Sequence, residues 1–165
     1  MSYNYLPLDR KRLNFAQVKN LLDYDQRVSI TFDAHERILK CREFIYKQGV
    51  NDKKLSERIN IAAGYELNGD QQLPEHPYKL IVDSACATGQ EMPLDIVKLM
   101  LMLKIKSLSY GQSGVDIETV KRLLDMYNGE VYPIVYTQGM GRAILSHLTL
   151  PLAGLGEVFY KGEKR

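Results

Sequence analysis

The sequence has little of what builds a covalently stapled or metal-centred protein. It holds two cysteines, three histidines and no tryptophan among its 165 residues. Cys41 and Cys86 lie far apart and form no CxxC pair, so we expect both to be small apolar core residues rather than a disulfide or a nucleophile. His35, His76 and His147 are scattered without the spacing of metal ligands, and no metal site is expected.

The sequence also lacks a strong charge of one sign and a long apolar run. The net charge is +2 with a pI near 8.4, and the basic residues are spread along the chain, which gives no electrostatic footprint for nucleic acid. No run of about 18 apolar residues could span a membrane, and the first residues lack the apolar centre of a secretory signal. We therefore expect a cytoplasmic protein with neither a nucleic acid nor a membrane as partner.

What the sequence does have is helical periodicity in ordinary globular proportions. Hydrophobic residues make up 45% and charged residues 25%, which suits one domain over residues 1–165. Apolar residues at helical spacing predict helices in residues 13–25, 33–49, 94–109, 116–128 and 141–152, and in two shorter segments, 52–63 and 78–89. Residues 27–32 are β-branched and predict a short extended segment, and residues 64–77 predict an exposed loop. The expected fold class is mainly α with at most short extended segments.

Two of these helices carry more specific signals. From Ile96 to Leu108 nearly every residue other than lysine is apolar. A helix that is apolar on most sides is buried on most sides, so this one is expected either inside the domain or partly covered by other subunits. Asp33 followed by Glu36 resembles a capping box at the start of its helix, and Asp116 is a candidate N-cap for the helix over 116–128.

The stretch "VYPIVYTQGMGRAILSH" (131–147) has the features of a site. A proline-broken extended run leads into a glycine-rich turn, and the turn leads into a helix. Such turns can present backbone N–H groups to an anion or a reaction intermediate. Gln138, Gly139 and Gly141 are therefore candidates for a ligand-binding or anion-binding turn, and a purely structural turn is the alternative.

A series of short motifs occurs in a specific order through the second half of the chain. They mark helix ends, helix starts and turns: Thr88-Gly89, Pro93, "YGQSGV" (110–115), Asn128-Gly129, Pro133, Gln138-Gly139 and "LSHLTLPLAGLGEVFYKGE" (145–163). In content and order this series resembles the histidine and phenylalanine ammonia-lyase family. The upstream "VSITFDAHERILKCREFI" also fits the family's N-terminal helix. The resemblance covers most of this chain but only the N-terminal part of a family member.

The resemblance implies a fold and a chemistry. Members of the family eliminate ammonia from an aromatic amino acid with an electrophile, methylidene-imidazolone (MIO), which forms from an Ala-Ser-Gly triplet of their own backbone. Serine is the source of the methylene, and glycine supplies the attacking amide nitrogen. Helix N-termini stabilise negative charge developing on the ring, and a loop tyrosine is the general base. The family builds its sites from several subunits of a tetramer.

The parts that carry this chemistry are missing or changed in this sequence. Between Gly139 and His147 it reads only "MGRAILS", and no Ala-Ser-Gly triplet occurs anywhere in the 165 residues. We therefore expect no MIO cofactor. The family's loop Tyr-Gly-x-x-Thr-Gly-Phe-Gly has no match, and its Asn-Leu-x-x-Ser-His-Ala aligns with a segment holding Lys79 and Ser84. Its Arg-x-Asn aligns with Lys104-Ile105-Lys106, and lysine cannot copy a guanidinium fork or an amide.

Two residues remain as weak catalytic candidates. Tyr65 lies near the position of the family's loop tyrosine, and a loop or partly packed tyrosine is the alternative to a general base. His147 matches the family's histidine after the active-site turn, and it is either a hydrogen-bonded structural residue or a proton-transfer group that needs a partner.

These observations lead to two main hypotheses about function. The first is an ammonia-lyase-like protein that lacks catalysis on its own and acts as a partner subunit or a binding module. The second is one component of an aromatic amino acid ammonia-lyase whose site is completed by another chain, and the sequence does not decide whether the chain is an enzyme. The expected partners are further copies of the chain or a second lyase-like subunit, with an aromatic amino acid as the candidate ligand.

Overall fold

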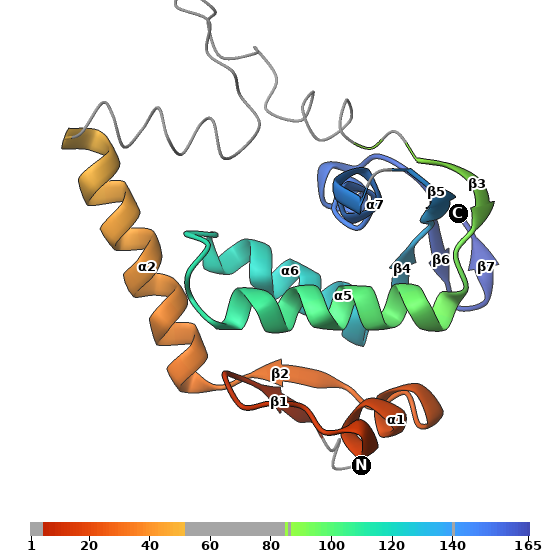
Figure 1. The fold of residues 1–165 in the computed structure, drawn as a ribbon, viewed down its shortest axis with the longest axis horizontal. Helices are drawn as coiled ribbons and strands as arrows, with labels where there is room; N and C mark the ends of the chain where they lie inside the picture. Colours follow the sequence, from red (N-terminus) through yellow and green to blue (C-terminus); the bar gives the residue numbers. More distant parts are fainter. Residues whose placement is uncertain (1–4, 52–84, 86, 140) are drawn as a thin grey trace, which may run out of the picture.

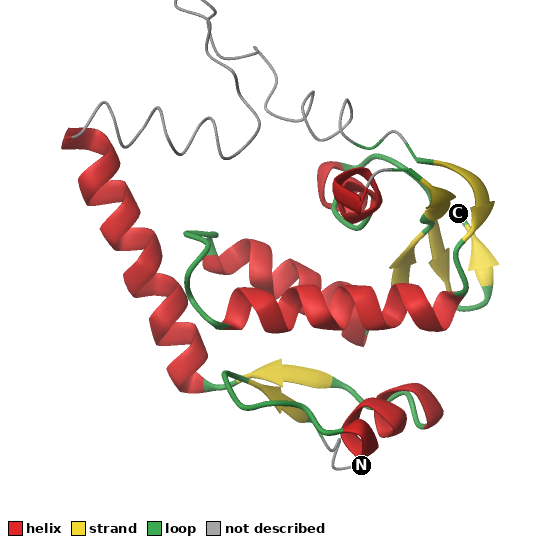
Figure 2. Cartoon of the chain, viewed as in Figure 1, coloured by secondary structure: helices red, strands yellow, loops and turns green. Residues whose placement is uncertain are grey.

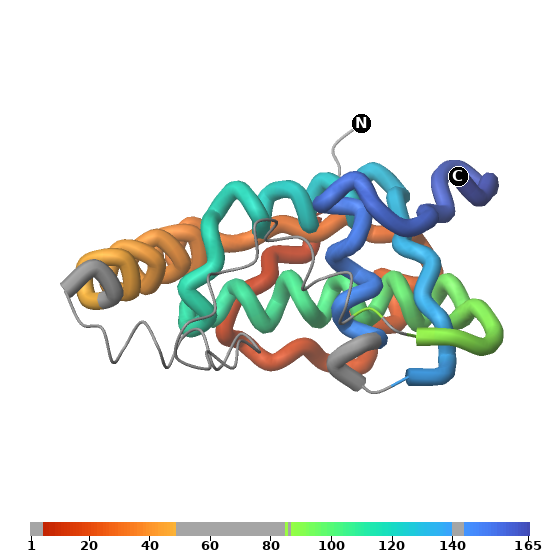
Figure 3. The backbone as a smooth tube through the Cα atoms, turned by 90° about the horizontal axis from the view of Figure 1, so that it is seen from above, coloured from red at the N-terminus to blue at the C-terminus, as the bar shows by residue number. Residues whose placement is uncertain are grey.

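The apolar helix α5 (Leu94–Ser109) is the element around which the others are arranged (Figure 1). The structure is a computed structural model and describes residues 5–51, 85, 87–139 and 141–165. The other described helices are α1 (Phe15–Asp23), α2 (Phe32–Asn51), α6 (Ile117–Asn128), α7 (Gly141–His147) and the 3-10 helix η1 (Leu150–Ala153). Figures 1 and 3 both place α6 along one side of α5, which it contacts.

The strands are short and form three separate small sheets (Figure 2). β1 (Leu6–Leu8) pairs with β2 (Val28–Ile30) in parallel, with Leu6 opposite Val28. β3 (Thr88–Glu91) pairs antiparallel with β5 (Tyr136–Gln138). The third sheet is antiparallel and has the order β4 (Val131–Pro133), β6 (Val158–Tyr160) and β7 (Glu163–Lys164). Helices therefore dominate the described residues, as the sequence predicts, and the extended segments are short.

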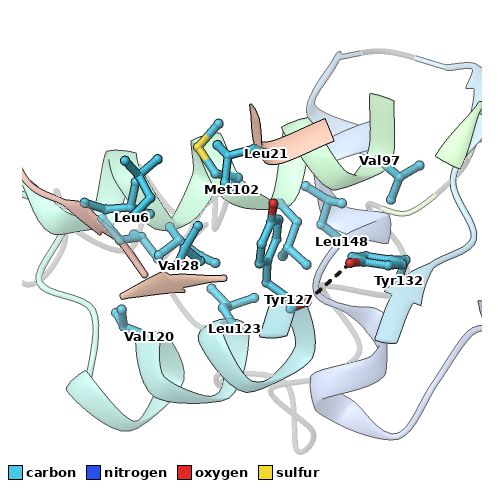
Figure 4. Packing of buried hydrophobic residues seen from close by; sticks show 14 of the residues in the cluster. Leu6, Leu21, Val28, Val97, Met102, Val120, Leu123, Tyr127, Tyr132 and Leu148 are labelled. Atoms are coloured by element: carbon cyan, nitrogen blue, oxygen red, sulfur yellow. Dashed lines mark hydrogen bonds between the residues drawn. The ribbon is translucent and has the colours of Figure 1, made fainter. Parts of the chain in front are cut away.

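The core lies where these elements meet α5 (Figure 4). Its side chains come from β1, α1, β2, α2, α5, α6, β4 and the loop residues that follow β4 and α7. They include Leu6, Leu21, Val28, Ile38, Val97, Met102, Val120, Leu123, Tyr127, Tyr132 and Leu148. The hydroxyl of Tyr132 donates a hydrogen bond of 3.4 Å to the carbonyl oxygen of Tyr127. Burial raises the pKa of Tyr127 to about 12, because the ionised phenolate would carry its charge inside the core, away from water.

Hydrogen bonds between the first part of the chain and the C-terminal end of α5 hold that end in place. The buried ammonium of Lys106 donates to the carbonyl oxygens of Asp9 and Lys11 at 2.7 and 2.6 Å. Arginine side chains donate to three carbonyl oxygens at and after the helix end: Arg37 to Ser109, Arg10 to Tyr110 and Arg42 to Gly114. Helix C-termini carry unpaired carbonyls and partial negative charge, and the arginines supply hydrogen-bond donors and positive charge there.

Glycines allow the turn after α5 to approach α2 closely. Gly111 and Gly114 both have φ of +67°, a backbone region that glycine adopts without strain. A Cβ at Gly111 would lie 2.7 Å from the backbone carbon of Arg37, and one at Gly114 would lie too close to Ile45. The "YGQSGV" motif is thus a close helix-to-turn contact in this structure.

Three details differ from the sequence-based expectations. Thr88 and Gly89 begin strand β3, so the helix predicted over residues 78–89 does not reach Gly89, and most of that segment lies outside the described residues. The single helix predicted over residues 141–152 is two, α7 and η1. Pro151 explains the break, because proline has no N–H for the helical ladder and restricts the residue before it.

The start of α2 is the third difference. The N–H of Ala34 bonds to the side-chain oxygen of Thr31 at 3.2 Å, and the helix begins at Phe32. Asp33 therefore lies in the first turn, where a carboxylate favours the positive end of the helix dipole, rather than at the cap. The N-cap predicted at Asp116 is confirmed, because its side chain accepts from the N–H of Glu118. The short helix predicted at 52–63 and the loop predicted at 64–77 lie outside the described residues.

The amide of Asn128 joins α6 to β2 and gives a direct test of this packing. Its oxygen accepts from the N–H of the fully buried Val28, and its nitrogen donates to the carbonyl of Val28, each at 2.9 Å. We expect Asn128→Ala to lower the free energy of unfolding in urea by about 1–3 kcal/mol, because two buried backbone groups lose a partner. Asn20→Ala, at an exposed position of α1, should change it by less than about 0.5 kcal/mol. Equal effects of the two substitutions would contradict this role.

Candidate functional site

The candidate turn lies between β5 and α7, beside β3. Strand β5 ends at Gln138 and helix α7 begins at Gly141, so two residues, 139 and 140, connect them. Thr88 is opposite Gln138 in the β3–β5 pair, and the hydroxyl of Thr137 donates to the carbonyl of Gln90 at 3.1 Å. The turn is thus held on one side by β3, the strand that directly precedes α5.

The side chain of Gln138 packs against a glycine rather than reaching into a pocket. Gly89 has φ of +92°, and a Cβ built there would lie 2.8 Å from Cγ of Gln138. The lack of a side chain at Gly89 therefore lets the two strands approach. Gln138 and Gly139 are both exposed, and nothing in the described residues gives them a ligand-binding contact. The ligand-binding turn at Gln138, Gly139 and Gly141 stays a prediction.

His147 is the last residue of α7 and is brought against Tyr136. Its side chain is only 7% exposed, and its ring meets that of Tyr136 edge to face at 5.7 Å between centroids. Its Nε2 atom is buried without a hydrogen-bond partner among the described residues. A buried, unpaired imidazole nitrogen is unusual, since such groups are nearly always hydrogen-bonded. A proton-transfer role for His147 stays a prediction.

Tyr136 is a residue that the sequence analysis missed. Its hydroxyl donates to Oε2 of Glu157 at 3.4 Å, which places it between His147 and an acidic side chain. Lys164 lies on the other side of Glu157, at 3.1 Å from the same oxygen, and at 2.7 Å from Oε1 of Glu91. Hydrogen bonds to these two carboxylates raise the pKa of Lys164. Strand alternation in "IVYTQ" would have placed Tyr136 on the side opposite Thr137, but not beside His147.

The structure places the remaining candidates away from this turn or outside the description. Tyr65, Lys79 and Ser84 lie outside the described residues. Lys106, which aligns with an amide of the family's Arg-x-Asn, is 8% exposed and bonds to two backbone carbonyls. It therefore serves the fold in this chain. Cys41 is free and half-buried and does not belong to the buried core, so the core position expected for it is wrong, and Cys86 lies outside the described residues.

Two negative findings concern the described residues. They contain no group of three histidine, cysteine, aspartate or glutamate side chains that could hold a metal ion. None of the helices in this part of the chain is both long enough and apolar enough to cross a membrane.

Comparison with known proteins decides the family. The model of the aromatic amino acid lyase family matches residues 13–165. This chain belongs to that family. The resemblance read from the sequence motifs is thereby confirmed.

Individual relatives agree with this assignment. Histidine ammonia-lyase of Legionella pneumophila (strain Corby) is 33% identical over 171 residues, which cover 99% of this chain and 34% of the relative. The histidine ammonia-lyase of Deinococcus radiodurans is 35% identical over 166 residues, covering 96% of this chain and 31% of the relative. The chain thus spans about a third of the length of the curated relatives it matches.

Solved structures share the fold of the family. Histidine ammonia-lyase of Trypanosoma cruzi superposes with a TM-score of 0.78 at 24% identity, covering 96% of this chain and 32% of that one. Tyrosine aminomutase of Streptomyces globisporus superposes with a TM-score of 0.79 at 20% identity, covering 98% and 32%. At these identities the comparison establishes the fold alone.

The unpaired nitrogen of His147 allows its structural role to be tested. We expect His147→Leu to cost less than about 1.5 kcal/mol in unfolding free energy, because a side chain of similar volume replaces one whose buried Nε2 has no polar partner among the described residues. His147→Ala should cost about 2 kcal/mol or more, because it leaves a cavity against Tyr136. Both are measured by urea unfolding. If Leu proves as costly as Ala, an imidazole nitrogen has a polar partner.

Proposed function

We propose that this chain keeps the scaffold of an aromatic amino acid lyase and lacks catalysis on its own, acting as a partner subunit or a binding module. The turn between β5 and α7 carries the proposal. Two residues separate the end of β5 from the start of α7, and no Ala-Ser-Gly triplet occurs in the 165 residues. The residues present at this turn therefore do not fit the electrophile that the family makes there.

The surroundings of the turn support the same conclusion. His147, Tyr136 and the exposed Glu157 contact one another in turn, through an edge-to-face ring pair and one long hydrogen bond. Lys106 is committed to the backbone of the N-terminal segment, and so it is not free to orient a substrate carboxylate. A helical scaffold tolerates such losses, because function depends on a few side chains and the fold on many periodic ones.

A second candidate function is one component of an aromatic amino acid ammonia-lyase whose site another chain completes. The observation that favours it is the similarity to histidine ammonia-lyases, which are 33% and 35% identical over 99% and 96% of this chain. On this hypothesis the described residues supply packing and the second chain supplies the electrophile. The partner is then a lyase-like subunit, and the reaction is elimination of ammonia from histidine, phenylalanine or tyrosine.

The two candidates differ in what the purified chain does by itself. We expect no unsaturated acid to form when the protein is mixed with histidine, phenylalanine or tyrosine, as followed by near-ultraviolet absorbance. Histidine ammonia-lyase of Legionella pneumophila, assayed on histidine in the same buffer, is the positive control. Formation of the unsaturated acid by the chain alone, at a rate that scales with its concentration, would overturn the proposal.

The binding-module form of the proposal makes a further prediction. An aromatic amino acid that binds the folded chain raises its Tm, with a stabilisation that grows as RT ln(1 + [L]/Kd). We expect such a rise with histidine, phenylalanine or tyrosine at about 100 times Kd to correspond to about 2.7 kcal/mol. Alanine is the matched control, because it shares the backbone charges and lacks the ring. If the Tm is the same with all four amino acids, the binding-module form of the proposal is wrong and only the partner-subunit form remains.

A further inference from the structure

The hairpin of β6 and β7 holds Lys164 in a fixed register. Lys161 and Gly162 join the two strands, and their φ angles are +49° and +85°. Positive φ at both central residues is the geometry of the tight two-residue turn that matches the twist of a hairpin. Lys164 therefore lies opposite Phe159, and the hairpin determines where its side chain begins.

From this position the ammonium of Lys164 reaches two carboxylates outside β7. It donates a hydrogen bond of 2.7 Å to Oε1 of Glu91 in β3, and it lies 3.1 Å from Oε2 of Glu157, just before β6. The three side chains are between 42% and 51% exposed, so either ion pair alone would be weak. One cation shared by two carboxylates is a network, and networks are where exposed ion pairs contribute measurably. We call these two contacts the Lys164 clamp.

The Lys164 clamp joins two sheets. β7 pairs with β6, whereas β3 pairs with β5, and these pairs belong to separate sheets. Figure 1 shows the two sheets beside each other at the end of α5 that follows β3. The contact between Lys164 and Glu91 therefore connects the hairpin to the sheet from which the candidate turn leaves.

Glu157 extends these contacts to both sides of the candidate turn. Its Oε2 accepts a hydrogen bond of 3.4 Å from the hydroxyl of Tyr136 in β5. The ring of Tyr136 meets the ring of His147, the last residue of α7, edge to face. Because the turn lies between β5 and α7, the same carboxylate contacts the strand before the turn and, through Tyr136, the helix after it. Lys164 holds this carboxylate together with that of Glu91 in β3.

We propose that the Lys164 clamp holds the hairpin against the β3–β5 pair and so limits the opening of the candidate turn. The pair is short, and β3 is exposed at all four positions, so it belongs to the parts of a fold that open at low cost. Salt screens exposed charges, so ionic strength sets how firmly the turn is held. The inference goes beyond the proposed function and does not depend on it, because none of these contacts involves a ligand or the family's triplet.

Hydrogen exchange of the full chain, measured by mass spectrometry of its peptides, tests the Lys164 clamp. Lys164→Met removes the charge and keeps an unbranched side chain. Amides in peptides that cover residues 88–91 and 136–138 should then exchange at least about threefold faster than in the wild type, because the strand pair opens more often. Peptides from α6, residues 117–128, should exchange at the wild-type rate. Lys164→Arg keeps a cation and should exchange as the wild type does throughout.

Lys161→Met is the matched control, because it removes the same charge from the same hairpin at a side chain that lies over the ring of Tyr160. It should exchange as the wild type does. In about 1 M NaCl the wild type should exchange as fast as K164M at both strands, and K164M should not respond further.

Four results would each overturn the proposal. They are wild-type exchange in K164M, equal acceleration with K161M, acceleration in K164R equal to that in K164M, and a wild type that does not respond to salt. Acceleration of the α6 peptides in K164M to the same extent overturns it as well, because Lys164 would then stabilise the whole fold rather than this contact.

Discussion

The fold of this chain depends on how the C-terminal end of α5 is held. The ammonium of Lys106 is buried and would be costly to bury alone, but the carbonyls of Asp9 and Lys11 accept its hydrogen bonds. Arg37 and Arg42, both from α2, bind carbonyls at and just after the helix end. One helix terminus thus ties together segments about a hundred residues apart in the sequence. The candidate turn is also connected to α5, because β3, which directly precedes α5, pairs with β5 at the start of the turn.

On the proposed function, this arrangement explains how a lyase scaffold persists without the family's catalytic residues. Packing is spread over many periodic positions of α5, α6 and the small sheets, whereas the family's chemistry depends on one triplet and a few polar side chains. Two residues connect β5 to α7, and β4, which precedes this turn in the chain, pairs with β6, which follows it. On the proposed function, the chain keeps the fold of the family and lacks the residues of its catalytic site.

Most helices, but few contacts of the site, could be predicted from the sequence. The stripes of α2, α5 and α6 and the cap at Asp116 are local patterns, and local patterns carry over into the structure. The helix expected over residues 141–152 ends earlier, at His147, although the apolar spacing continues as far as Pro151. Lys106 bonds to the carbonyls of Asp9 and Lys11, which lie far away in the sequence, and Tyr136 contacts His147 across a turn. Periodicity predicts neither contact. The amide of Asn128 on Val28 is a contact of the same kind.

The central claim is that this chain does not convert its own backbone into an electrophile. The most direct measurement is the intact mass of the purified protein, together with peptide mapping across residues 131–147. The account predicts the mass of the unmodified sequence and an unmodified peptide over that range, since cyclisation of the family's triplet releases water. A mass lower by released water, mapped to any segment of the backbone, would contradict it.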